Sequence, residues 1–302
     1  MIDLEKSEKL PRPRRYFNIS IIWIFYFRNV IRILYYLRIP HEAITLLSVI
    51  LGVFSAYLFY AGNFIAAAVT LHFKDIFDAS DGAIARLTGR GHLIGRYLDS
   101  LGDFFSLTLV MLAIGLRAAQ TGEHIYIVWS AVAVFSTFIQ CSFFNYYQLS
   151  YLKAFGVDTL SSKRDETARA DRYGGFESKP ARILLDICRL FYIIVYSWQD
   201  KLVAAIDRFL VGKNKRNIEL SDEKRYGNKF LMTLQSALCF GTHIFIIISA
   251  ALWGKPETAL IFIAVFMNIY LLIVLYLRKR HYRIQAASNP AVSRPQIKTL
   301  EE

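Results

Sequence analysis

The sequence predicts an all-α fold, a polytopic membrane helix bundle with six transmembrane helices and an N-terminal amphipathic surface helix. Hydrophobic residues make up 55% of the 302 residues, and the mean hydropathy is positive. Apolar runs of about 18 or more residues recur along the chain, and each is long enough to cross the hydrocarbon core as a helix. The net charge of +12 fits charge sorting between loops and attraction to anionic lipid heads. We therefore expect membrane lipid, and no nucleic acid, as a partner.

Residues 1–41 are expected to form a cytoplasmic N-terminus and an amphipathic interfacial helix. The stretch 16–37 is apolar but carries Arg28, Asn29 and Arg32 along one side. This distribution, together with several aromatic residues, is typical of a helix that lies on the membrane surface. The alternative is that residues 16–37 insert as a first span, and the sequence leaves it open.

Residues 42–152 are expected to contain the first four transmembrane helices. Short polar turns around Gly62 and Gly122 divide this region, because glycine and its polar neighbours favour turns. The predicted spans are 42–61, 63–87, 93–118 and 123–152.

Residues 153–228 are expected to form a cytoplasmic basic insert. The segment 183–211 is apolar but contains many charged residues, and its longest uncharged run, Leu190 to Gln199, is too short to cross a bilayer. We predict a second amphipathic surface helix here, and insertion of 183–211 stays open. Two final spans, near 229–253 and 258–278, occupy residues 229–280, and residues 281–302 form a cytoplasmic tail.

The distribution of basic residues predicts the orientation. On this layout the connections at 61–63, 118–123 and 253–257 share one side, and of the 36 Lys and Arg only Arg117 and Lys255 sit beside them. By the positive-inside rule, both termini and the inner end of the second span face the cytoplasm.

Four aspartates interrupt the apolar pattern of the second and third spans. Asp78 and Asp81 lie three residues apart on one predicted helix, and Asp99 and Asp103 lie four apart on the next, so each pair projects from one face. Ionised carboxylates in a membrane are costly unless they are paired or hold a metal ion. Ligands that are all oxygens suit Mg²⁺ or Mn²⁺ rather than Zn²⁺. The alternative is a buried salt-bridge cluster with nearby basic residues, namely Lys74, Arg86, Arg90 and Arg96.

The spacing of this motif is specific. It runs Asp78, two residues, Asp81-Gly82, two residues, Ala85-Arg86, eight residues, Gly95, three residues, Asp99, three residues, Asp103. All eight defining positions of the CDP-alcohol phosphotransferase (CDP-alcohol phosphatidyltransferase) signature match, and the chain resembles that family over the two motif helices.

The resemblance implies a role for each matching residue. Asp78, Asp81 and Asp99 would ligate the metal ions, of which two are expected, and Asp103 would be both a ligand and the catalytic general base. With Asp78, the residues Gly82, Ala85 and Arg86 would form the CDP pocket, the two small residues giving room and Arg86 supplying charge-assisted hydrogen bonds.

Further candidate residues flank the motif. The stretch Pro40–Thr45 is similar to the family's nucleotide-contacting segment, with Glu42 and Thr45 at the matching positions, although Pro40 is one residue further away than usual. A helix N-cap role for Glu42 or Thr45 explains them nearly as well. Arg90 and Arg96 are candidates for recognising a phosphorylated or anionic acceptor, and the alternative is that they solvate a cytoplasmic face.

The resemblance implies an integral membrane transferase of phospholipid synthesis. A hydroxyl acceptor would attack a CDP-alcohol donor such as CDP-diacylglycerol, and CMP would leave. The family further implies a homodimer. One rival is a transferase that uses CDP-choline or CDP-ethanolamine with diacylglycerol as acceptor. A rival of another class is a divalent-cation transporter, since carboxylates within spans often mark ion paths.

Overall fold

The computed structural model describes residues 14–19, 24–88, 93–156, 193–212 and 221–288, with a few positions between 183 and 191. Within these residues the regular elements are helices and none is a strand, which confirms the all-α prediction. In chain order the helices are α1 (Ile24–Tyr36), α2 (His41–Tyr60), α3 (Phe64–Thr88), α4 (Leu93–Gln120), α5 (Ile125–Ala154), the π-helix η4 (Ile193–Ser197), α7 (Trp198–Val211), α9 (Asp222–Tyr226), α10 (Lys229–Ser236), α11 (Phe240–Leu252), α12 (Glu257–Ile261), the π-helix η5 (Phe262–Phe266) and α13 (Met267–Ala287).

Several described helices could cross a membrane. Four are long and apolar enough: α2, α4 from Asp99 onward, α5, and the continuous helix from α12 through η5 to α13. The pair α10 and α11, bent by 44°, would be a fifth if it counts as one span. Helix α3 has 25 residues but is less apolar, because its second half carries the aspartate motif. The chain is therefore an integral membrane protein, and the count of six spans stays a prediction.

The N-terminal surface helix is shorter than the sequence indicated. Helix α1 has 13 residues, about 20 Å at the rise of an α-helix, and is therefore too short to span the bilayer. Ile31 and Leu34 are buried against Ile84 of α3, while Arg28 and Arg32 are exposed. The amphipathic character is confirmed, and the alternative of a first span at 16–37 is not supported.

Residues 14–18 precede α1 without being part of it. The Tyr151 hydroxyl donates to the carbonyl of Arg14, and the Ser236 hydroxyl donates to the carbonyl of Phe17. These contacts tie the segment to α5 and α10. The prediction of a helix from residue 16 was therefore wrong at its start, because the backbone there bonds to distant helices instead of to its own next turn.

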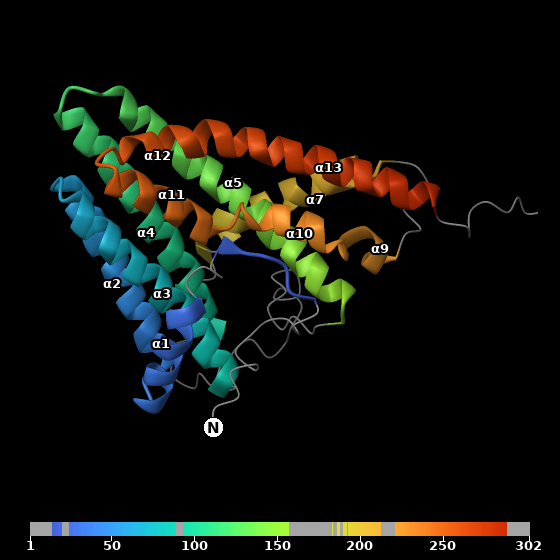
Figure 1. The fold of residues 1–302 in the computed structure, drawn as a ribbon, viewed down its shortest axis with the longest axis horizontal. Helices are drawn as coiled ribbons and strands as arrows, with labels where there is room; N and C mark the ends of the chain where they lie inside the picture. The colour runs from blue at the N-terminus through green and yellow to red at the C-terminus, as the bar shows by residue number, and fades with distance from the viewer. Residues whose placement is uncertain are drawn as a thin grey trace, which may run out of the picture.

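The tight turns gather at one end of the bundle. Figure 1 shows the α2–α3, α4–α5 and α11–α12 connections side by side. Gly62, Gly122 and Gly254 have φ values of 82°, 98° and 74° in these turns, a conformation that favours glycine. The three predicted turns are present and lie at one end of the bundle, whereas the membrane topology and the side that they face stay predictions.

The described part of the insert forms one amphipathic helical segment, η4 and α7. Its buried residues recur at helical spacing: Tyr196, Gln199, Val203, Asp207 and Val211. Asp207 is 2% exposed and accepts hydrogen bonds from four tyrosine hydroxyls on α5, α9 and α13, those of Tyr146, Tyr147, Tyr226 and Tyr282. Residues 193–211 are thus helical with one buried face, and a position at the membrane surface stays a prediction. This segment is not among the candidate spans, and its inner face packs into the bundle.

Polar side chains also join the later helices in the interior. Gln140 of α5 donates to Asn268 of α13 at 2.9 Å and lies 2.7 Å from the His243 ring of α11. Hydrogen bonds between helices of this kind stabilise membrane bundles, because lipid offers polar groups no partners. These bonds hold α5, α11 and α13 together in the interior of the bundle.

Candidate metal centre

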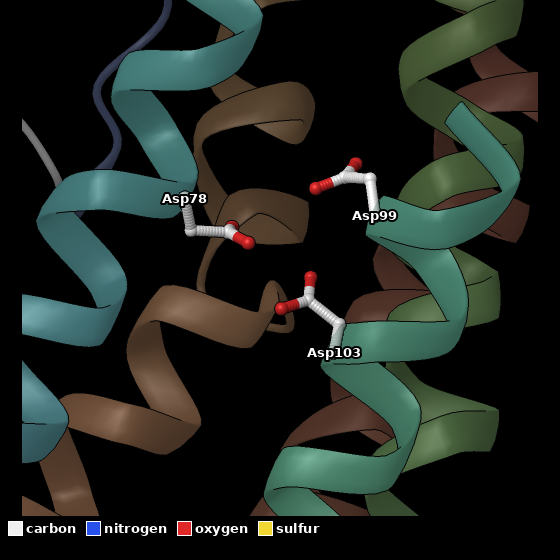
Figure 2. A group of neighbouring side chains, drawn as sticks. All are labelled: Asp78, Asp99 and Asp103. Carbon is white, nitrogen blue, oxygen red and sulfur yellow. The ribbon is translucent and has the colours of Figure 1, made fainter. Parts of the chain in front are cut away.

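Three of the four motif aspartates meet between α3 and α4. Asp78 points from α3 toward Asp99 and Asp103, which lie one turn apart on α4 (Figure 2). One carboxylate oxygen from each residue lies within 4.8 Å of the others, so the three could hold a single metal ion. The spacing of four residues explains the pairing on α4, because residues i and i+4 lie on one helical face.

Lys74 lies between these carboxylates. It precedes Asp78 by four residues on α3, and its ammonium donates to Asp78 Oδ1 at 3.3 Å and also to Asp103 Oδ1. The Lys74 side chain is 3% exposed. The alternative of a buried salt-bridge cluster is therefore confirmed in part, for Lys74 with Asp78 and Asp103.

The fourth aspartate, Asp81, has a different partner. It is buried, and Thr45 of α2 donates its hydroxyl hydrogen to Asp81 Oδ2 at 2.5 Å. Asp81 does not belong to the group of three oxygens that could share an ion. Its role as a ligand stays a prediction, and the structure shows it as an acceptor that faces α2.

Helix α2 supplies a second hydroxyl to the site. Ser48, one turn after Thr45, donates to Asp78 Oδ1 at 3.4 Å. Sequence reasoning missed Ser48, although its spacing of three residues from Thr45 places both hydroxyls on one face of α2. This face and the motif face of α3 meet because the two helices pack along their length in an antiparallel pair.

Close approach of α2 and α4 fixes the position of the α4 carboxylates. A Cβ at Gly52 would lie 2.4 Å from the Ser106 hydroxyl oxygen, and a Cβ at Gly102 would lie 2.4 Å from a Val49 methyl carbon. Glycine is needed at both places because any side chain would push the helices apart. Gly102 therefore serves the packing of α4 on α2.

The expected nucleotide residues lie on the last two turns of α3. Gly82 and Ala85 are partly buried and Arg86 is exposed, with its guanidinium 3.4 Å from the place where a Cβ of Gly82 would be. Glu42 is exposed in the first turn of α2, 3.3 Å from the His41 ring. The structure thus gathers Gly82, Ala85 and Arg86 and leaves Glu42 at the surface.

The N-cap alternative for Glu42 and Thr45 is wrong. Helix α2 begins at His41 with Pro40 in the N-cap position, so Glu42 lies in the first turn and Thr45 lies inside the helix. Glu42 can still interact favourably with the helix dipole there. Thr45 is accounted for by its bond to Asp81.

The two candidate acceptor-recognition residues are not placed. Arg90 lies outside the described residues. Arg96 belongs to α4, but its side chain lies outside what the structure describes. Their proposed contact with an anionic acceptor remains a prediction.

One residue of the insert reaches the motif helix. The Tyr196 hydroxyl of η4 donates to the Ser100 carbonyl at 2.9 Å, between Asp99 and Asp103 in the sequence. Tyr196 is 5% exposed. The motif did not indicate this contact; only the helical spacing of the apolar residues in 193–211 could have shown that Tyr196 faces inward.

The donor set fits a hard divalent cation. The three clustered side chains offer carboxylate oxygens alone, and the described residues include no histidine or cysteine in that group. Mg²⁺ and Mn²⁺ prefer such ligands, whereas Zn²⁺ prefers nitrogen and sulfur. Asp78, Asp99 and Asp103 are therefore the residues that would hold the ion.

Comparison with known proteins points in the same direction. The model of the family described as CDP-alcohol phosphatidyltransferase matches residues 39–196, just over half of the chain. An uncharacterized protein of Aquifex aeolicus is 33% identical over 101 residues, 33% of this chain and 52% of that protein. An archaetidylinositol phosphate synthase of Pyrococcus horikoshii is 34% identical over 80 residues, 26% of this chain and 43% of that protein. The chain spans about half the length of the curated relatives it matches.

Proposed function

The chain belongs to the CDP-alcohol phosphatidyltransferase family, and from this premise we propose that it transfers a phosphoalcohol group from a CDP-linked donor to a hydroxyl acceptor and releases CMP. The observation that carries the proposal is the meeting of Asp78, Asp99 and Asp103 within reach of one ion. Carboxylates of two adjoining membrane helices suit the binding of a metal–diphosphate complex.

The roles of the residues follow from their positions. Bound Mg²⁺ or Mn²⁺, for which we propose two ions, would neutralise the donor diphosphate and stabilise charge that develops during displacement. Asp78 and Asp99 would hold the ions from the two motif helices together with Asp103, and Asp81 would extend this set on the side of α2. Asp103 accepts the proton of the attacking hydroxyl while the bond to CMP breaks.

The nucleotide end of the donor is assigned to the last turns of α3. Gly82 and Ala85 offer little side-chain bulk next to the carboxylates, and Arg86 can donate charge-assisted hydrogen bonds to phosphate or base oxygens. Glu42 and Thr45 stay secondary candidates. Thr45 acts through Asp81, because its hydroxyl carries one hydrogen and lies closer to the Asp81 carboxylate, at 2.5 Å, than to the His41 carbonyl, at 3.0 Å.

We propose CDP-diacylglycerol as the donor and a polar alcohol as the acceptor. A site that lies between membrane helices can receive a lipid donor from the bilayer and a water-soluble acceptor from the cytoplasm. The name of the Pyrococcus horikoshii relative, archaetidylinositol phosphate synthase, makes an inositol phosphate a natural member of the acceptor panel. A homodimer, as the family implies, is part of the proposal.

CMP release by the purified full-length protein tests the proposal. The protein is incubated in nanodiscs with Mg²⁺ or Mn²⁺, CDP-diacylglycerol and a panel of head-group alcohols. A second arm offers CDP-choline or CDP-ethanolamine with diacylglycerol, which would identify the rival transferase. Release should depend on one acceptor and on the added metal.

Replacement of the proposed base gives the decisive comparison. Asp103→Asn removes a proton acceptor without changing shape, so CMP release should fall by about 10²–10⁴-fold. The matched control is Asp222→Asn, because Asp222 is an exposed carboxylate of α9 away from the motif helices. Equal rates for the two variants, or no release with any donor from a folded preparation, would contradict the proposal.

A cation-transport function is less well supported. Transport predicts acidic groups distributed toward both sides of the membrane, whereas the clustered aspartates lie at one level of α3 and α4. Gly82, Ala85 and Arg86 would also have no purpose in a transporter. Uptake of Mn²⁺ into sealed vesicles that contain the protein, in the absence of any donor, would revive this alternative.

A further inference from the structure

Lys74 has no assigned part in the reaction proposed above, yet it lies among the metal-binding carboxylates. Its side chain is 3% exposed, and its ammonium donates to Asp78 Oδ1 and to Asp103 Oδ1, one residue from each motif helix. A surface lysine would keep its ammonium in water. Lys74 instead joins α3 to α4 at the place where the ion would bind.

The physical reason for a buried lysine here is charge balance. Carboxylates from two helices repel each other in a medium of low polarity, and each is unstable without a counter-ion. The ammonium supplies one positive charge and three hydrogen-bond donors, which is enough to hold Asp78 and Asp103 close together. A buried lysine is in turn stable there because its ammonium donates to two carboxyl groups.

The same contacts place Lys74 in competition with a metal ion. A divalent cation and the ammonium seek the same carboxylate oxygens, and the two positive charges repel each other at this range. We infer that Lys74 is an internal counter-ion that holds Asp78 and Asp103 together without metal and weakens the binding of the divalent cation. The inference rests on the proposed function for the identity of the ion.

This arrangement has a consequence for substrate binding. When the donor brings its negatively charged diphosphate into the site, the added charge offsets the ammonium. Metal should therefore bind more tightly together with the donor than alone. Lys74 makes metal loading depend on the presence of a nucleotide diphosphate, so the carboxylates are not permanently occupied.

Titration of the purified full-length protein with Mn²⁺, followed by electron paramagnetic resonance and without any donor, tests the inference. Lys74→Met removes the ammonium but keeps an unbranched side chain only one atom shorter, and Lys74→Gln keeps a hydrogen-bond donor without the charge. Both variants should bind Mn²⁺ at least about tenfold more tightly than the parent protein, because the repelling charge is gone. Lys201→Met, which removes a charge from an exposed position of α7, should leave Mn²⁺ affinity unchanged.

Thermal unfolding separates this result from a folding defect. Without metal, Lys74→Met should unfold at a lower temperature than the parent, and saturating Mn²⁺ should raise its unfolding temperature by more than it raises the parent's. Unchanged or weaker Mn²⁺ binding in either folded Lys74 variant would overturn the inference. A parent protein that binds Mn²⁺ but releases no CMP would instead overturn the proposed function alone.

Discussion

At the scale of single residues, hydroxyl donors set the geometry of the acidic site. Thr45 donates to Asp81, and Ser48 donates to Asp78, so α2 orients both motif carboxylates of α3. Buried carboxylates need such donors because an unsatisfied charged acceptor is costly. Helix α2 therefore contributes two hydroxyl donors to the site.

Thr45→Val tests this contribution, because valine has the shape of threonine but no hydroxyl. The loss of the donor to buried Asp81 should reduce stability by about 1–3 kcal/mol and weaken Mn²⁺ binding. Thr45→Ser should retain both properties. The matched control is Thr70→Val, since the Thr70 hydroxyl donates to a carbonyl of its own helix at 2.8 Å. Chemical denaturation and Mn²⁺ titration in detergent provide the measurements; equal losses in the two valine variants would refute a specific role for Thr45.

The sequence predicted the positions of single residues best where the residues concerned lie three or four positions apart on one helix. Spacings of three and four residues correctly placed Asp78, Asp99 and Asp103 on facing sides of two helices. The same spacing could not reveal that Asp81 turns to Thr45, 36 residues earlier. That partner depends on how α2 packs on α3, which no periodicity within one helix specifies.

At the scale of elements, apolar periodicity predicted the long helices well and their ends poorly. The bend between α10 and α11 falls where a single span was expected at 229–253. No proline marks it. Instead, Ser236 and Cys239 at the bend contact Phe17 and Asn18, more than two hundred residues earlier. Such long-range contacts are invisible in a local pattern.

The packing partner of the insert helix could likewise not be predicted from its local sequence pattern. Its contact with α4 can be tested. Tyr196→Phe removes the donor to Ser100 next to Asp99. We expect a stability loss of about 1 kcal/mol and a several-fold fall in CMP release. Tyr270→Phe is the matched control, because the Tyr270 hydroxyl donates to the Leu234 carbonyl at 2.8 Å, away from the motif. It should lose comparable stability at an unchanged rate. Equal rates for both variants would show that Tyr196 contributes packing alone.

At the scale of the whole molecule, two groups of helices share one end and separate toward the other. The three tight turns lie together, and from them α2, α3 and α4 run in one direction while α5 and α13 run in another (Figure 1). The acidic site lies on the first group, and η4 and α7 lie against the second. Tyr196 of η4 links the insert to the first group, because its hydroxyl donates to the Ser100 carbonyl of α4. The helix that carries Asp99 and Asp103 is therefore in contact with an element that lies far from it in sequence.

This architecture makes the orientation in the membrane testable. Few basic residues lie at the end with the turns, so the positive-inside rule places that end outside and the insert in the cytoplasm. In a variant without the native cysteines, Thr121→Cys should react with an impermeant maleimide added to intact cells. Asp222→Cys should react only after permeabilisation. The two positions are exposed polar residues of the α4–α5 turn and of α9, which makes their chemical reactivity comparable. Labelling of Asp222→Cys alone in intact cells would reverse the orientation, and the donor and acceptor would then have to reach Asp103 from outside the cell.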